Sequence, residues 1–108
     1  MTQTASLALI RGDGIGIDVA NAAMAVADAA CARCGCALRV TDIAAGAGYF
    51  RDTGRDIEPG GEDRAGTHDA IFLGAIGLPS VRHTDGTEIS PHLRLRDQYG
   101  LYAGVRPV

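Results

Sequence analysis

The hydrophobic pattern at the start of the chain changes from the period of a strand to that of a helix. Residues 6–10 (SLALI) form a short apolar run, which predicts a buried strand. A glycine-rich turn over residues 11–16 follows, and residues 18–34 then predict a helix. The apolar side chains expected on one face of this helix are Val19, Ala23, Val26 and Ala30.

The middle of the chain returns to strand patterns. Residues 37–43 alternate apolar and polar side chains and predict a second strand. Residues 44–60 carry four glycines and predict a loop-rich stretch, followed by a short helix over 61–66. Residues 70–74 (AIFLG) are fully apolar, which is typical of a central strand.

The last third predicts an excursion, a helix and a strand. Residues 80–90 form an extended excursion around a turn at Asp85-Gly86, residues 91–100 contain a short helix, and 101–108 resemble a strand. Strands that alternate with helices indicate an α/β fold with a mostly parallel sheet and flanking helices. Because the chain stops at an apolar strand without a polar tail, we expect an incomplete fold.

Composition narrows the class of protein. A chain of 108 residues fits one small domain. A net charge of -3 without a basic run argues against nucleic-acid binding. All ten basic residues are arginine, so no lysine can act as a base or nucleophile. We expect no membrane association and a cytoplasmic location, because no apolar run approaches about 18 residues and no signal peptide is recognisable.

Two motifs suggest ligand contacts. The turn GDGIG over residues 12–16 lies between a strand and a helix, but its spacing is not the G-x-G-x-x-G of dinucleotide-binding proteins. A tight turn and a ligand contact therefore both stay open. Near the end of the chain, Arg96 and Arg106 could converge on one carboxylate, while a solvated basic face would explain the same spacing.

Taken together, three segments resemble the isocitrate, isopropylmalate and tartrate dehydrogenase family. They are GDGIG at 12–16, GAIGLP at 74–79, and LR followed after nine residues by RP at 95–107. The resemblance covers nearly the whole chain in the family's order. It implies that residues 1–108 are the N-terminal part of an isopropylmalate-dehydrogenase-like domain, with the C-terminal remainder of the fold absent.

The resemblance implies a substrate site near the end of the chain. Arg96 and Arg106 resemble the family's arginines that bind the malate carboxylate, and Ser90 the hydroxyl residue near substrate and nicotinamide. His92 falls where the family recognises the variable side group of its substrate, and a histidine departs from the known types. Arg94 has no family counterpart, so we expect it to be a surface residue.

Cofactors are implied in the same way. Gly14 and Ile15 fall where the family contacts the adenine side of NAD or NADP, and Ser90 lies near the nicotinamide. The family uses Mg²⁺ or Mn²⁺ as a Lewis acid in oxidising and decarboxylating a small 2-hydroxy acid, and forms homodimers. Its metal ligands, catalytic tyrosine and lysine lie beyond this segment. Ile17, where many relatives have proline, is a minor departure.

The remaining polar residues suggest weaker hypotheses. Cys31, Cys34 and Cys36 have spacing seen in zinc and redox sites, but three cysteines are too few for a structural zinc site, and packing at a helix end explains them. His68 and His83 are expected in loops. We expect the acidic side chains of the middle segment to form a solvated surface: Glu58, Glu62 and Asp63.

Three functional hypotheses follow. The chain is a fragment of a family dehydrogenase and is inactive alone, or a non-catalytic module that docks on a full-length relative or binds an anionic metabolite, or a remnant without a ligand. A ligand that binds the native state raises its melting temperature, which separates the last from the others.

Overall fold

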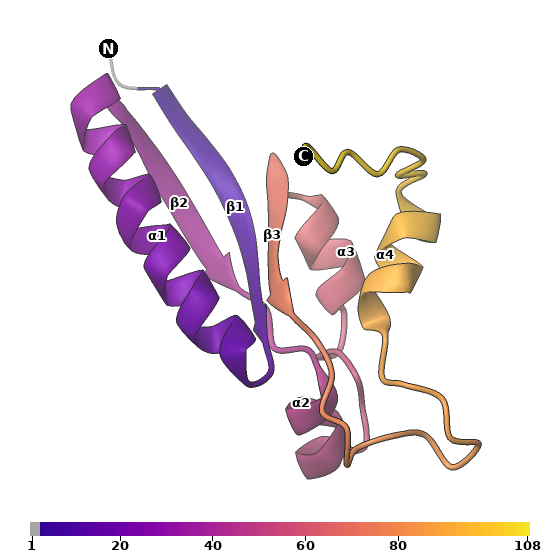
Figure 1. The fold of residues 1–108 in the computed structure, drawn as a ribbon. Helices are drawn as coiled ribbons and strands as arrows, with labels where there is room; N and C mark the ends of the chain where they lie inside the picture. Colours follow the sequence, from indigo (N-terminus) through magenta and orange to yellow (C-terminus); the bar gives the residue numbers. More distant parts are fainter. Residues whose placement is uncertain (1–2) are drawn as a thin grey trace.

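The computed structural model describes residues 3–108, which form a parallel sheet flanked by helices (Figure 1). The α/β class predicted from the sequence is confirmed. In chain order the elements are β1 (Gln3–Gly12), α1 (Ile15–Cys34), β2 (Cys36–Asp42), α2 (Ala47–Thr53), α3 (Gly61–Gly66), β3 (Ala70–Ala75) and α4 (Pro91–Gln98).

The strand in the centre of the sheet is β1. The order is β2-β1-β3, and both pairings are parallel. Leu7, for example, lies opposite Val40 of β2 and Ala70 of β3. The expectation that residues 70–74 form a central strand is wrong for this sheet, since β3 lies at its edge. The reason is that β1 is the longer strand, and its side chains at 8–10 are buried on both faces.

Helices cover both faces of the sheet (Figure 1). α1 lies along one face and contacts all three strands, while α3 and α4 lie on the other side of β3. Connections between parallel strands are right-handed, so a chain that moves from β1 to β2 and then back past β1 to β3 places its helices on opposite faces. The apolar cluster beneath α3 and α4 consists of Ala8, Ile10, Ile43, Ala45, Ile57, Ala65 and Leu95.

The face that α1 turns to the sheet differs from the predicted one. Val19 and Val26 are 46% and 70% exposed and Ala30 is also exposed, so the predicted apolar face is wrong except at Ala23. The less exposed positions are small residues that let the helix approach the sheet closely. They recur at helical spacing and are Gly16, Ala20, Ala23, Ala27 and Cys31, joined by Met24.

α1 is long and apolar enough to cross a membrane by length and composition, with a mean hydropathy of 1.4. The expectation that no apolar stretch approaches membrane length is therefore wrong by this measure, because alanine, valine and cysteine outweigh Asp18 and Asp28. A helix that packs on a sheet in a soluble protein passes the same test, so the finding does not establish a membrane span.

Two further segments differ from the prediction. Residues 44–60 were expected to be loop, but they contain α2, and two of their glycines, Gly46 and Gly54, flank that helix with positive φ angles of 132° and 80°. Residues 101–108 form no strand, because no neighbouring strand satisfies their backbone and all eight are exposed.

The other elements follow the prediction closely. α3 spans Gly61–Gly66 as expected, and α4 ends two residues earlier than the predicted helix. β1 and α1 each begin three residues before the predicted start. The excursion over 80–90 turns at Asp85-Gly86, where the Asp85 carboxylate accepts a hydrogen bond from the Thr87 N–H at 2.9 Å, and an isolated bridge joins Arg82 to Glu88.

Candidate functional site

Two glycines of the GDGIG turn are required by close packing. Gly12 has a φ of +79°, and a side chain there would overlap the Ala75 carbonyl. A Cβ at Gly16 would lie 2.5 Å from the Arg11 carbonyl oxygen and 2.6 Å from the Ala75 nitrogen. These two glycines let the start of α1 approach the ends of β1 and β3, so they need no ligand to explain them.

The middle glycine of the turn is different. Gly14 has φ 52° and ψ -123°, and a Cβ there would meet no atom within 4 Å. It precedes α1, whose N-terminus is not capped by a side chain. Ile15 follows as the first helical residue and is 72% exposed. The two predicted cofactor residues, Gly14 and Ile15, therefore lie together on an open surface.

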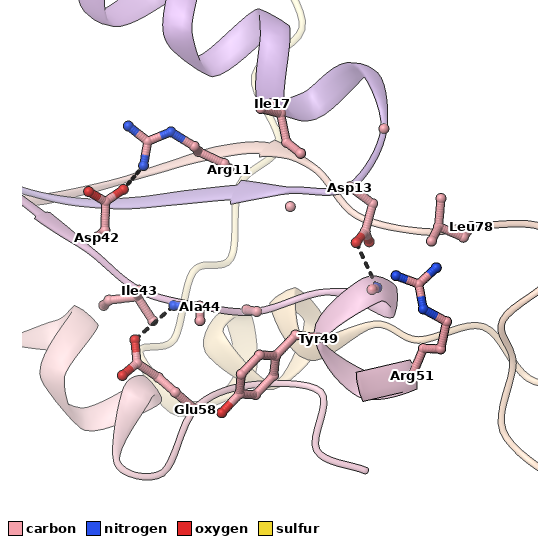
Figure 2. Close-up of a pocket in the computed structure, with 14 residues that line it drawn as sticks. Arg11, Asp13, Ile17, Asp42, Ile43, Ala44, Tyr49, Arg51, Glu58 and Leu78 are labelled. Atoms are coloured by element: carbon pink, nitrogen blue, oxygen red, sulfur yellow. Dashed lines mark hydrogen bonds and ion pairs between the residues drawn. The ribbon is translucent and has the colours of Figure 1, made fainter. Parts of the chain in front are cut away.

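The aspartate inside the same turn is an anchor that the sequence analysis missed. Asp13 is 7% exposed, and its carboxylate accepts hydrogen bonds from the backbone N–H groups of Ala47 at 2.7 Å, Gly48 at 2.8 Å and Gly77 at 2.9 Å. Figure 2 shows the side chain pointing from the end of β1 to the first turn of α2. Asp13 thus joins the GDGIG turn to α2 and to the GAIGLP turn.

A cavity of about 540 Å³ opens beside this anchor, at the carboxyl ends of β1 and β2 (Figure 2). In open parallel sheets, ligands bind outside the carboxyl ends of the strands where the strand order reverses. In this sheet the order reverses between β1 and β3, and the cavity extends from the ends of β1 and β2 to Leu78, which follows β3. Its lining includes Arg11, Asp13, Gly14, Ile17, Asp42, Ala45, Tyr49, Arg51, Glu58 and Leu78.

Charges of both signs line the cavity. The Arg11 guanidinium forms an ion pair with Asp42. The Glu58 carboxylate pairs with Arg64 at 2.6 Å and accepts a hydrogen bond from the Ala44 N–H at 2.7 Å. The hydrogen bond from Arg64 is the main reason that the pKa of Glu58 lies below its ordinary value. Glu58 therefore connects the loop after β2 to α3. The expectation that it is a solvated surface acid is wrong.

The predicted substrate residues lie on and after α4. Ser90 is half-buried before the helix, and its hydroxyl donates to the Glu88 carbonyl at 3.3 Å. Arg96 is exposed on α4, and Arg106 is exposed in the segment after it. Within residues 3–108 neither guanidinium forms an ion pair, and neither lines the cavity beside the glycine turn.

His92 lies one helical turn before Arg96 and is half-buried. Its Nδ1 atom is buried and has no hydrogen-bond partner among the described residues. Burial, followed by the nearby positive charge of Arg96, lowers the pKa of His92 below its ordinary value. The imidazole is therefore neutral at pH 7, with an unused ring nitrogen.

Arg94 is exposed at the surface, as expected, and its side chain binds two carboxylates. Its guanidinium donates to both oxygens of Asp56, at 2.6 and 2.7 Å, and to Glu62 at 2.9 Å. These contacts hold α4 against α3 and the loop before it. Nearby, the Gln98 amide donates to Asp63 at 2.8 Å. The expectation of a solvated surface therefore holds for Asp63, which is exposed, and is wrong for Glu62, which is half-buried and bound by Arg94.

The Arg94–Asp56 pair should make stability depend on pH. The hydrogen bond from Arg94 is the main cause that lowers the pKa of Asp56 in the folded protein. The stabilisation by the Arg94–Asp56 ion pair is therefore complete above about pH 3.9, which is the pKa of an aspartate in the unfolded chain. It is lost as the pH falls through the lower pKa that Asp56 has in the folded protein. Urea unfolding between pH 6 and 2 should show that Arg94→Ala removes about 1 kcal/mol at pH 6 and progressively less as the pH falls toward 2. An equal loss at both pH values would contradict the ion pair's role.

Metal ligands are not gathered by the part of the chain that the structure describes. No group of three or more histidine, cysteine or acidic side chains in it could hold a metal ion, and this includes the cysteines near the end of α1. The residues present therefore do not fit a complete divalent-metal site. The ring of His83 packs edge-on against the ring of Phe50, with 5.0 Å between the centroids. This contact gives His83 a role in packing.

The chain matches known proteins over almost its whole length. The family profile described as isocitrate/isopropylmalate dehydrogenase matches residues 6–108. A 3-isopropylmalate dehydrogenase from Thermobifida fusca is 38% identical over 98% of this chain and 30% of its own length. A second, from Beutenbergia cavernae, is 36% identical over 99% of this chain and 30% of its own length. The chain thus spans about a third of the length of these relatives.

A solved structure agrees with the sequence matches. The apo crystal structure of a β-decarboxylating dehydrogenase from Thermococcus kodakarensis aligns with a TM-score of 0.70 and 31% identity, over 91% of this chain and 27% of that one. The fold is therefore a part of that larger fold, as expected from the sequence. The chain belongs to the isocitrate/isopropylmalate dehydrogenase family.

Proposed function

We propose that this chain provides the N-terminal part of an NAD(P)-dependent enzyme that oxidises and decarboxylates a malate-type 2-hydroxy acid. The observation that carries the proposal is the contrast between two arginines of α4. Two carboxylates neutralise Arg94, whereas Arg96, two residues later, has no ion-pair partner among residues 3–108. A free guanidinium on a helix that is held in place is suited to bind the carboxylate of a substrate.

The substrate would lie along the exposed side of α4. Arg96 and Arg106 would donate paired hydrogen bonds to its carboxylate groups and fix the orientation of the C2 hydroxyl. Ser90 would contact both the substrate and the nicotinamide. Neutral His92 would recognise the side group, since its buried Nδ1 has no partner within the described chain. The side group could be that of 3-isopropylmalate, isocitrate or tartrate, and a polar group suits the imidazole best.

NAD or NADP would bind on the open surface of the glycine turn. Gly14 leaves room for a close approach, and the exposed Ile15 side chain offers an apolar contact for the adenine side. When bound, the cofactor accepts a hydride from the substrate. The residues described here do not form a metal site, so any Mg²⁺ or Mn²⁺ would need ligands from outside this chain.

The assembly is also part of the proposal. Because the chain spans about a third of its relatives, the active site would be complete only with the remaining segments, as a cytoplasmic homodimer. The alternative is a module that docks on a full-length relative. In its favour, β2 and β3 each lie at an edge of the described sheet, and residues 101–108 expose Tyr102 and Val105. Co-elution of the purified chain with a full-length relative would support that alternative.

Binding to the chain itself tests the substrate proposal. Titration of the ¹⁵N-labelled protein with 3-isopropylmalate, isocitrate and tartrate should shift amide resonances between Ser90 and Arg96 and around Arg106. Each of Arg96→Ala and Arg106→Ala should weaken the affinity by roughly ten-fold or more, because a charge-assisted hydrogen bond contributes about 1.5–3 kcal/mol. Arg33→Ala at the end of α1 removes the same charge elsewhere and should change little.

Two outcomes would overturn the substrate assignment. One is equal binding of the acids by the wild-type chain, Arg96→Ala and Arg106→Ala. The other is a set of shifts confined to other parts of the chain, such as the cavity beside Asp13.

A further inference from the structure

α1 is more apolar than its packing on the sheet requires. Of its 20 residues, only Gly16 and Ala20 are fully buried. Figure 1 shows α1 at the outer edge of the molecule, with no other element of residues 3–108 beyond it. Apolar side chains are therefore left on a side of the helix that nothing in the described chain covers.

The exposed apolar side chains form one row along the helix, which we call the α1 face. Its members are exposed and lie alternately three and four residues apart: Val19, Ala22, Val26 and Ala29. This is the spacing by which one helix packs lengthwise against another. With 3.6 residues per turn, the row points well away from the row of small residues that faces the sheet. The α1 face can therefore be covered by a second helix without disturbing the sheet.

The charged residues beyond the two ends of the α1 face are opposite in sign. Asp18 lies in the first turn of α1, and Arg33 lies in the last. Both side chains are exposed, and neither forms an ion pair within residues 3–108. If two α1 helices pair antiparallel about a two-fold axis near Val26, Asp18 of each copy lies level with Arg33 of the other. The unused charges of one copy therefore complement those of a second copy.

We propose that the α1 face binds the α1 face of a second copy of this chain in antiparallel orientation. The two Val26 side chains meet near the axis, and the alanines let the helices approach closely. An Asp18–Arg33 pair lies at each end. The antiparallel arrangement also places the positive start of each helix beside the negative end of the other.

The α1 face is separate from the surfaces proposed for the substrate and the cofactor. α4 lies on the other side of the sheet from α1 (Figure 1). In the register set by the Asp18–Arg33 pairs, Ile15 lies beyond the end of the partner helix at Cys34. The inference therefore concerns the chain itself and does not rest on the proposed function.

A second copy fits the α1 face better than a lipid surface does. Helices that lie on membranes usually carry lysine and arginine on their polar side. The exposed part of α1 carries Asp18 and Asp28, and the whole chain has a net charge of -3. An anionic bilayer would repel these charges. Because the helices touch over only about 22 Å, we expect a weak dimer.

Sedimentation equilibrium of the purified chain tests the proposal. The mass should rise from 11.2 kDa toward twice that value as the concentration increases from about 10 µM to about 1 mM. Val26→Glu should raise the dissociation constant at least about ten-fold, because it brings two carboxylates together near the axis. Val105→Glu is the matched control: it replaces a still more exposed valine in the segment after α4 and should leave the constant unchanged.

Charge reversal tests the antiparallel register. Asp18→Arg and Arg33→Asp should each raise the dissociation constant roughly ten-fold, since each turns two ion pairs into two like-charge contacts. The double variant should restore the wild-type value to within about three-fold, whereas a parallel pair would show neither effect. Asp28→Arg changes an exposed aspartate of α1 outside the α1 face and should have little effect. Circular dichroism of dilute samples checks that each variant is folded.

Other occupants of the α1 face give different results. A chain that stays monomeric at about 1 mM would overturn the proposal and assign the face to a segment that the longer relatives carry outside the matched part. Binding to phosphatidylglycerol vesicles that is lost in Val26→Glu would assign it to a membrane. A dimer weakened by Val105→Glu and not by Val26→Glu would place the contact in the segment after α4. Failure of the double variant to restore the dimer would rule out the antiparallel register.

Discussion

Replacement of Asp13 by alanine should lower the free energy of unfolding by about 3–5 kcal/mol, because it leaves buried donors without a partner. The carboxylate accepts three backbone N–H groups from two segments that are far away in the sequence. For a domain whose total stability is about 5–15 kcal/mol, this loss is large. Urea unfolding followed by circular dichroism measures it directly.

Two control variants sharpen this prediction. Asp13→Asn keeps the size of the side chain but turns an N–H₂ toward backbone N–H groups, so it should also destabilise, by about 2 kcal/mol. Asp18→Asn removes the same charge from the exposed first turn of α1 and should cost no more than about 1 kcal/mol. If Asp13→Ala were as stable as Asp18→Asn, Asp13 would not be the anchor described here.

Replacement of Gly16 by alanine should destabilise the protein by about 3 kcal/mol, although helix propensity alone predicts a gain of about 1 kcal/mol. The new Cβ would lie 2.5 Å from the Arg11 carbonyl oxygen and within 2.7 Å of the Ala75 backbone. Both contacts are with the main chain, which cannot rotate away as a side chain can. The start of α1 would have to move off the ends of β1 and β3.

Gly14→Ala is the matched control for Gly16→Ala. The same side chain at Gly14 meets nothing within 4 Å, and only its positive φ of 52° opposes the change. Because φ 52° and ψ -123° are a conformation that alanine rarely adopts, the expected loss is about 1–2 kcal/mol. Thermal unfolding of the two variants should therefore differ clearly. Equal melting temperatures for the two variants, or a stabilised Gly16→Ala, would contradict the close packing of the turn.

Much of the fold could be predicted because local patterns determine it. The apolar runs at 6–10 and 70–74 and the alternation at 37–43 each produced a strand, and α3 begins and ends as predicted. The order of strands could not be read in this way, because pairing depends on contacts between distant segments. The inward face of α1 was mispredicted because its valines point to solvent, while Gly16 and Ala20 allow the closest approach to the sheet.

In the candidate site, too, local motifs could be predicted from the sequence and contacts between distant residues could not. The motif residues Gly14 and Ile15 were identified from the sequence, and the structure places both on an open surface. Asp13 was missed because its three partners lie 34 to 64 residues away. The ion pairs of Arg94 could not be predicted because its partners, Asp56 and Glu62, are 38 and 32 residues away. An aspartate between two glycines that pack closely is a local signal that could have suggested the anchor.

The most direct test of the central claim is the activity of a chimera. In it, this chain replaces the aligned 30% of the Thermobifida fusca 3-isopropylmalate dehydrogenase. We expect no turnover by the 108-residue chain alone, and metal-dependent reduction of NAD or NADP by the chimera with one of the malate-type acids. Arg96→Ala in the chimera should lower kcat/KM by roughly a hundred-fold or more, while Arg33→Ala should not. A chimera that folds and melts like the relative but is inactive, or equally active with Arg96→Ala, would contradict the account.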